Sequence, residues 1–213
     1  MANQDPGLHY EGNTLRAGEW STGPVPVEVT RALCEAHHYA KGCSKVHVLS
    51  EGLFNKALPT PMGVAQWLPP APGPAKWVAK HTGCSPDKVL ALSRMVIVPG
   101  VPKNAASYLL AASVRRLRAM GWGVAVTYAD GLEEHTGLVY LASNWVPAGA
   151  TRPRPRWVDQ SGTMRSTKAT VNLTVADMRA RGWTRVPGLP KPRFLYAINR
   201  RYRRAVNTMK EEP

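Results

Sequence analysis

Apolar positions along the chain alternate between short runs typical of strands and longer stripes typical of helices. The strand pattern occurs at residues 46–49, 63–68, 89–98, 123–128, 157–158 and 194–198, and the helix pattern at residues 26–40, 75–81, 104–120 and 174–181. A loop over 52–61 separates the first two strands, and the proline-rich stretch 69–74 is a connection without ladder donors. Residues 1–25 are polar and predict an irregular arm.

The middle of the chain predicts a strand, a helix and a second strand. Asn104 is a suitable helix cap, and Gly121 follows the last residue of the apolar helix stripe. Such a unit predicts a crossover to a parallel strand, and ligands of these sheets collect beyond the strand ends. Asp130 follows the second strand, and a helix expected to begin near Glu133 carries Tyr140. We therefore expect Asp130 and Tyr140 to face one cleft.

Length and composition favour one domain with an elaboration, because 213 residues can build one substantial core. No apolar run approaches the roughly 18 residues that a membrane span needs, and the amino terminus lacks a secretion signal. The three cysteines are Cys34, Cys43 and Cys84, and an odd number argues against a disulfide framework. We expect a soluble intracellular protein with no membrane partner.

Positive charge is concentrated near the carboxy terminus. Residues 151–204 carry 14 Lys and Arg against 2 Asp and Glu, whereas residues 1–150 carry 13 against 10. Two arginine clusters with neighbouring aromatic residues lie there, formed by Arg152, Arg154 and Arg156 and by Arg200, Arg201, Arg203 and Arg204. Guanidinium groups beside aromatic rings contact phosphates and stack on bases, so this region predicts a nucleic-acid partner. A solvated basic surface is the alternative.

Two resemblances follow from these residues. The order of strand, helix, strand and helix, ending in Tyr140-Leu-Ala-Ser-Asn-Trp145, resembles the acyl-CoA-binding half of the GNAT acyltransferase superfamily. In many members, a tyrosine at the place of Tyr140 protonates the departing CoA thiolate. The superfamily's glycine-rich pyrophosphate loop is reduced here to one glycine within residues 99–104. Helix amino termini still bind anions, which would involve Asn104, Ala105 and Ser107.

A narrower resemblance runs from about residue 31 to residue 157. The motifs that carry it are His38-Tyr39, Leu92-Ser93-Arg94, Asn104-Ala-Ala-Ser107, Tyr128-Ala129-Asp130, His135-x-Gly137-x-x-Tyr140 and Asn144-Trp145. Together they resemble the Mom family of phage proteins, which convert adenine in DNA to a methylcarbamoyl (acetamido-type) derivative that blocks restriction. The resemblance implies acetyl-CoA or a related acyl-CoA and iron as ligands, double-stranded DNA as the partner, and the host cytoplasm as the location.

The same resemblance implies functional roles for His38, Tyr39, Arg94, Asp130 and Tyr140. Asp130 would orient or deprotonate the adenine amine, or it is an Asp-Gly turn residue. Tyr140 would be a general acid, or an aromatic that packs its helix. Arg94 would hold an anionic cofactor group or orient Asp130, or form a structural ion pair.

His38 and Tyr39 would bind the target base or a metal, or His38 is a structural group at a helix end. A zinc site from Cys34-x-x-His37 and His81-x-x-Cys84 requires that the two pairs meet.

The resulting hypothesis is an α/β protein with a GNAT-like mixed central sheet flanked by helices. It assigns residues 1–25 to an arm, 26–150 to a catalytic core and 151–213 to a basic extension that packs on the core and contacts DNA. Two other functions remain open from sequence. One is a GNAT N-acetyltransferase for a small-molecule or protein amine, and the other is a non-catalytic DNA-binding accessory protein.

Overall fold

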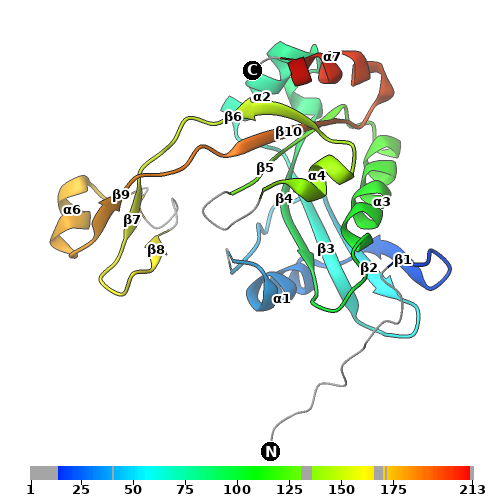
Figure 1. Cartoon of the computed structure of the whole chain (residues 1–213), viewed down its shortest axis with the longest axis horizontal. Coiled ribbons are helices and arrows are strands. Elements are labelled where there is room, and N and C mark those ends of the chain that lie inside the picture. Colours follow the sequence, from blue (N-terminus) through cyan, green and yellow to red (C-terminus); the bar gives the residue numbers. More distant parts are fainter. Residues whose placement is uncertain (1–13, 40, 131–135, 166–169, 171, 212–213) are drawn as a thin grey trace, which may run out of the picture. The chain divides into compact units, whose positions relative to one another are not determined.

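The larger of two sheets in the described residues is mixed and seven-stranded, with strand order β1-β2-β3-β4-β5-β10-β6 (Figure 1). The computed structural model describes residues 14–39, 41–130, 136–165, 170 and 172–211. The strands are β1 Trp20–Pro24, β2 Leu49–Asn55, β3 Pro61–Leu68, β4 Val89–Ile97, β5 Val124–Tyr128, β6 Val146–Ala150 and β10 Pro192–Ala197. Strands β1 to β4 pair antiparallel, and β4 pairs with β5 in parallel, as predicted.

Among the helices, α1, α2 and α3 lie close to their predicted ranges, and α7 was not predicted. Their bounds, with those of α4, are α1 Val27–His37, α2 Pro72–Thr82, α3 Ala105–Ala119, α4 Leu138–Ala142 and α7 Arg203–Thr208. Pro72 starts α2, and Gly83 ends it with a φ of 67°, a left-handed conformation that favours glycine. Within the described residues, no helix is both long enough and apolar enough to cross a bilayer.

Helices α1 and α3 cover opposite faces of the sheet. Alternate residues of a strand point to opposite faces, and Glu51 on β2 is opposite Ala65 on β3. Glu51 binds Arg116 of α3, whereas Gln66, the next residue on β3, bonds to Ser44 in the segment after α1. A core of apolar side chains packs against α1, formed by Val25, Cys34, Val64 and Val96 with Val29, Leu33, Cys43 and Phe54.

The chain divides into two compact units. The first comprises Met1–Thr127, Leu138–Ala148 and Phe194–Pro213, and the second comprises Tyr128–Gly137 and Gly149–Arg193. The second unit contains a small sheet of order β8-β7-β9, built from β7 Arg156–Val158, β8 Met164–Arg165 and β9 Thr184–Val186. Its helix α6, Val175–Ala180, starts with a capping box, in which Thr174 and Asp177 each bond to the backbone N–H of the other.

Two predicted irregular segments are strands instead. Residues 20–24 of the expected arm form β1, which pairs with β2 over Trp20↔Asn55 to Pro24↔Glu51. The expected loop over 52–61 is wrong for its first residues, because β2 continues to Asn55. Gly52 indicated a turn, but a Cβ there would lie 2.6 Å from Val25 Cγ1, so the glycine permits close packing.

Candidate functional site

Strands β4 and β5 pair in parallel over their first three residues, and this backbone pairing ends before Leu92. The parallel register covers Val89↔Val124, Leu90↔Ala125 and Ala91↔Val126, whereas β4 continues beside β3 to Ile97. At the next position, the side chain of Thr127 makes the connection, and its hydroxyl donates to the Leu92 carbonyl over 3.2 Å. A side-chain bond thus takes the place of a ladder bond where the two strands stop pairing.

Tyr140 of α4 lies in an aromatic cluster beside this point. Its ring centroid is 5.6 Å from that of Trp145 and 5.3 Å from that of Phe194, and Trp145 also stacks on Trp67 of β3 at 6.1 Å. Trp145 is 3% exposed. The indole N–H groups of Trp145 and Trp67 are buried, and neither has a hydrogen-bond partner among the described residues. The aromatic cluster therefore contains two buried N–H groups that donate to no described residue.

The phenol of Tyr140 is held in its neutral form. Burial raises the pKa of Tyr140, and a hydrogen bond with Thr127 works in the opposite direction. The net effect is a raised pKa, so the phenol keeps its proton throughout the neutral range. A protonated phenol at the edge of an aromatic cluster is suited to give a proton to a leaving group. This agrees with the general-acid role that the resemblance implied, and leaves that role a prediction.

Asp130 forms a carboxylate site with two cations in the second unit. Arg156 Nη2 and Lys191 Nζ both donate to Oδ2, at 2.8 and 2.6 Å, and the residue is only 5% exposed. Burial acts to raise the pKa of Asp130, but the hydrogen bonds from Lys191 and Arg156 outweigh it and lower the pKa overall. The other oxygen, Oδ1, has no hydrogen-bond partner among the described residues. An ionised carboxylate is better suited to accept a hydrogen bond than to remove a proton.

Arg94 makes different contacts from those that the sequence suggested. Its Nε donates to the Gly42 carbonyl at 2.8 Å, and its Nη1 donates to the Ser93 carbonyl at 2.7 Å. No carboxylate is among its described partners, and the cations on Asp130 are Arg156 and Lys191. Arg94 thus forms no ion pair within the described residues, and the roles that the resemblance implied for it stay predictions. Arg94 instead holds the loop that follows α1.

His38 and Tyr39 lie together at the end of α1. Their ring centroids are 4.4 Å apart, and Tyr39 is 44% exposed. Among the residues that the structure describes, no three His, Cys, Asp or Glu side chains gather into a metal site. Burial raises the pKa of the Cys34 thiol to about 11, which disfavours the thiolate that zinc requires. His135, part of the resemblance motif, lies outside the described residues.

At the start of α3, the groups predicted to bind the cofactor make hydrogen bonds within the protein instead. Asn104 occupies the predicted cap position of α3, but its side chain makes no capping hydrogen bond: Oδ1 accepts from the Leu15 amide at 2.6 Å and anchors a preceding segment instead. The Ser107 hydroxyl donates to the Asn104 carbonyl at 2.8 Å. The Ala105 amide donates to the Pro102 carbonyl at 3.0 Å. A cofactor phosphate at this helix start would have to use other groups.

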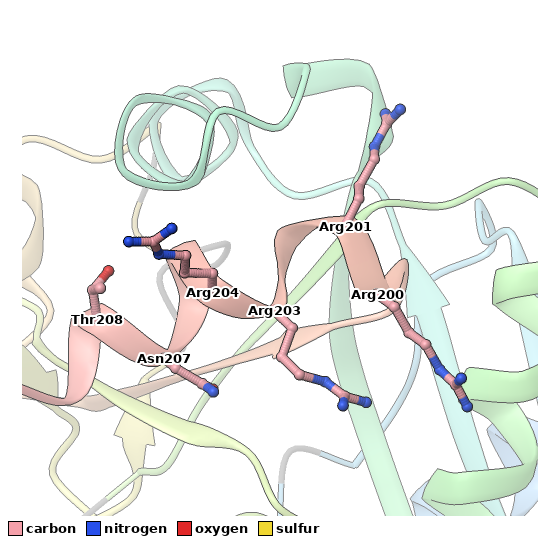
Figure 2. A pocket seen from close by; sticks show the side chains of 6 residues that line it. All are labelled: Arg200, Arg201, Arg203, Arg204, Asn207 and Thr208. Carbon is pink, nitrogen blue, oxygen red and sulfur yellow. The ribbon is translucent and has the colours of Figure 1, made fainter.

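The carboxy-terminal arginines line an open groove of about 550 Å³ together with Asn207 and Thr208 (Figure 2). The groove is lined by Arg200, Arg201, Arg203, Arg204, Asn207 and Thr208, and no carboxylate is among these residues. Figure 2 shows Arg200, Arg203 and Asn207 directed to one side of the segment and Arg201, Arg204 and Thr208 to the other. Tyr202, Val206 and Met209 are buried, and they fix the segment. Helical spacing thus places Arg200 and Arg203 in one cationic stripe and Arg201 and Arg204 in a second, and both are apart from the buried apolar residues.

The other predicted arginine cluster is split. Arg152 and Arg154 are exposed, whereas Arg156 is bound to Asp130. A Cβ at Gly188 would lie 1.9 Å from the Arg154 carbonyl oxygen, so the chain around Arg154 runs directly against this glycine. Arg156 therefore belongs to the carboxylate site, and its contact with DNA stays a prediction. Arg152 and Arg154 remain predicted contacts.

Sequence reasoning missed Thr127, Lys191 and Trp67. Lys191 is separated from Asp130 by 61 positions, so no local spacing links the two. Thr127 and Trp67 are ordinary strand residues by pattern. One signal was present for Thr127, because a hydroxyl in a buried strand needs a hydrogen-bond partner.

Comparison with solved structures shows the fold. The chain is similar to a proposed acetyltransferase from Acinetobacter baylyi ADP1, with 9% identity and a TM-score of 0.50 over 84% of this chain and 91% of that one. It is also similar to an N-acetyltransferase from Staphylococcus aureus Mu50, with 12% identity and a TM-score of 0.49 over 84% and 99%. A third is the GNAT family N-acetyltransferase YhbS from Escherichia coli, solved in complex with CoA, with 12% identity and a TM-score of 0.44 over 59% and 67%.

The predicted fold class is confirmed: this is a mixed α/β protein of the GNAT type. No match is found among curated proteins. A family model described as the Mom protein family matches residues 19–213, from the start of β1 to the carboxy terminus. The chain therefore belongs to the Mom protein family.

Proposed function

We propose that this protein transfers an acyl-derived group, of the methylcarbamoyl or acetamido type, to the N6 amine of adenine in DNA and so protects the DNA from restriction. The observation that carries the proposal is the Asp130 carboxylate, whose Oδ2 is held by Arg156 and Lys191 while Oδ1 has no described partner. Membership of the Mom family and the GNAT-type fold support the transfer of an acyl-type group.

The chemistry of adenine explains why such a carboxylate is required. The N6 amine is conjugated with the ring, so it is a poor nucleophile that must be oriented closely. Asp130 Oδ1 accepts one N6–H and aligns the nitrogen, while the two cations keep the carboxylate ionised. Tyr140 supplies the proton that the leaving group takes up. Because the amine is enclosed in a duplex, the base must first leave the stack.

An acyl-CoA is the donor that the fold class favours. At the acyl end the residues fit, because the buried N–H groups of Trp145 and Trp67 are donors suited to a carbonyl oxygen. The phosphates of an acyl-CoA would lie near the start of α3. There, Pro99 and Pro102 have no backbone N–H to donate to a phosphate, and Lys103 places an exposed positive charge before α3. Iron does not fit the described residues, since they contain no cluster of metal-binding side chains. No step is assigned to a metal.

The groove of carboxy-terminal arginines is the proposed contact for the DNA backbone. Four guanidinium groups within five residues, with no lining carboxylate, attract phosphates and release counterions on binding. The buried base of Tyr202, Val206 and Met209 keeps the arginines on a fixed surface. Arg152 and Arg154, which are exposed in the second unit, are proposed as additional backbone contacts.

Neutralising one stripe is expected to weaken DNA binding more than neutralising the other. The Arg201 side chain lies over the Tyr202 ring at 4.5 Å and bonds to its hydroxyl, whereas the side chains of Arg200, Arg203 and Arg204 bind no described residue. The double change R200Q/R203Q should therefore reduce the slope of log K against log salt by about 1.8, and R201Q/R204Q by about 0.9. Fluorescence anisotropy over a salt series measures both slopes.

The matched control removes two exposed charges elsewhere. K45Q/R115Q lowers the net charge equally, and both side chains are exposed outside the groove. We expect a slope within about 0.3 of the unchanged protein. Equal slope changes in all three variants would show that only net charge matters, and would contradict the backbone contact.

Modification of cellular DNA tests the function directly. We expect that expression in bacterial cells, followed by digestion of their DNA to nucleosides and mass spectrometry, reveals a deoxyadenosine species of raised mass. Tyr140→Phe removes the phenol proton but keeps the ring in its aromatic cluster, so it should lower this species by about 10²–10⁴-fold. Melting temperatures would check that the variant stays folded.

Two outcomes would replace the proposal. If cellular DNA stays unmodified while the purified protein acetylates small amines from acetyl-CoA, the protein is an ordinary N-acetyltransferase. If it binds DNA tightly and modifies neither substrate, it is an accessory DNA-binding protein. Full modification by Tyr140→Phe would remove Tyr140 from the reaction.

A further inference from the structure

The chain continues to pair with the β10 segment after β5 ends at Tyr128. The Ala129 amide donates to the Pro192 carbonyl at 3.0 Å, and β5 and β10 are neighbours in the larger sheet. Alternate residues of an extended strand point to the same face. The side chains of Tyr128 and Asp130, on either side of Ala129, therefore share one face.

The partners of these two side chains agree with this placement. The Arg193 guanidinium lies over the Tyr128 ring, 5.9 Å from its centroid, and Lys191 Nζ donates to Asp130 Oδ2 at 2.6 Å. Arg193 and Lys191 are also two positions apart along the chain. The four residues thus form two neighbouring pairs, one with an aromatic ring under a cation and the other with a carboxylate. All four belong to the second unit.

We propose that the ring of Tyr128 stacks on the target adenine, whose N6 amine then reaches Asp130. This inference rests on the proposed function, because it names the residue that holds the base which that function modifies. The first four residues of β5 are buried, whereas Tyr128 is partly exposed, so part of its surface is available to a ligand. Alternate strand residues are separated by about 7 Å, close to the length of a purine, so a base on the ring brings one edge to the carboxylate.

An extruded base needs both of these neighbouring groups. A base that leaves the duplex loses its stacking neighbours, and an aromatic side chain replaces them. The Arg193 cation is attracted to the face of the Tyr128 ring, which limits the orientations of the ring and lowers the entropy cost of binding. Stacking accepts any base, whereas an ionised carboxylate requires a donor, such as the N6 amine. The ring therefore supplies affinity, and Asp130 selects bases that carry an amine.

Three DNA duplexes separate the two contributions. Each has one unpaired nucleotide within randomised sequence: adenine, purine without the N6 amine, or an abasic sugar. Fluorescence anisotropy measures the three Kd values, and the unchanged protein should bind the abasic duplex about 5- to 100-fold more weakly than the purine duplex, because stacking is lost. Tyr128→Leu should make the purine and abasic duplexes nearly equal and keep the preference for adenine over purine. Tyr128→Phe keeps the ring and should preserve both differences.

The matched control is Trp183→Leu. Trp183 is another partly exposed aromatic residue of the second unit with guanidinium groups over its ring, those of Arg165 at 5.2 Å and Arg181 at 5.6 Å. Its loss should leave the ratio of the purine and abasic Kd values unchanged. Melting curves followed by circular dichroism check that each variant is folded.

Equal Kd values of the unchanged protein for the purine and abasic duplexes would overturn the stacking role, and this comparison needs no variant. An undiminished ratio in folded Y128L, or an equal loss in W183L, would overturn it as well. The measurement requires no turnover, so it is independent of the reaction. A protein that shows the expected Kd ratios and leaves cellular DNA unmodified would refute the proposed function and support the base site.

Discussion

Replacing Asp130 by alanine is expected to reduce adenine modification by at least about 100-fold, because the reacting amine loses the acceptor that orients it. Asp130→Asn should reduce it nearly as much. The amide keeps the size of the carboxylate but lacks the negative charge that holds Arg156 and Lys191 on one oxygen. The measurement is the rate of modified deoxyadenosine formation at saturating DNA.

The matched control for Asp130 is Asp159→Asn. Asp159 pairs with Arg165 at 2.6 Å in the same unit, so this change also breaks an ion pair of that unit. We expect activity within about 3-fold of the unchanged protein, because this change leaves Asp130 and its two cations in place. If D159N and D130N lose activity to the same degree, the carboxylate at position 130 is only structural.

Acid should weaken the Asp130 site in a defined direction. The pKa of this carboxyl is lower in the folded protein than in the unfolded chain, because Lys191 and Arg156 favour the ionised form. Its contribution to stability is therefore present above the ordinary carboxyl pKa and is lost as the pH falls through the folded value. Asp130→Asn should show a smaller decrease in melting temperature on acidification than the unchanged protein.

The second large effect concerns stability, and is expected for Arg116. Glu51 is 0% exposed, and Arg116 donates to both of its oxygens, at 2.8 and 3.3 Å. Arg116→Met removes the cation and leaves the buried carboxylate unpaired, so we expect the free energy of unfolding to fall by about 3–5 kcal/mol. Urea denaturation followed by circular dichroism measures this change.

Two further variants test the reason for this loss. Arg115→Met changes the neighbouring, exposed arginine and should change stability by less than about 0.5 kcal/mol. The double variant E51M/R116M removes both charges and should recover much of the loss, because apolar side chains avoid burying an unpaired charge. If the double variant is less stable than R116M, burial of an unpaired charge is not the cause.

Local sequence patterns predicted most elements because their signals are local. The proline and glycine around α2, the apolar stripe of α3 and the capping box of α6 act within a few residues. The same rules failed at β2, where buried Glu51 and the tightly packed Gly52 resemble a polar loop. A strand with a buried ion pair does not follow the alternating pattern from which strands are predicted.

By itself, the sequence determined the order of strands and helices, the basic carboxy-terminal region and the motifs that relate the chain to the Mom family. Only the tertiary structure decided the partners: Asp130 pairs with Arg156 and Lys191 while Arg94 holds a loop, and Asn104 anchors Leu15 instead of capping its helix. Helix and strand signals depend on neighbouring residues. Hydrogen bonds and ion pairs depend instead on which distant segments packing brings together, and no local spacing records that.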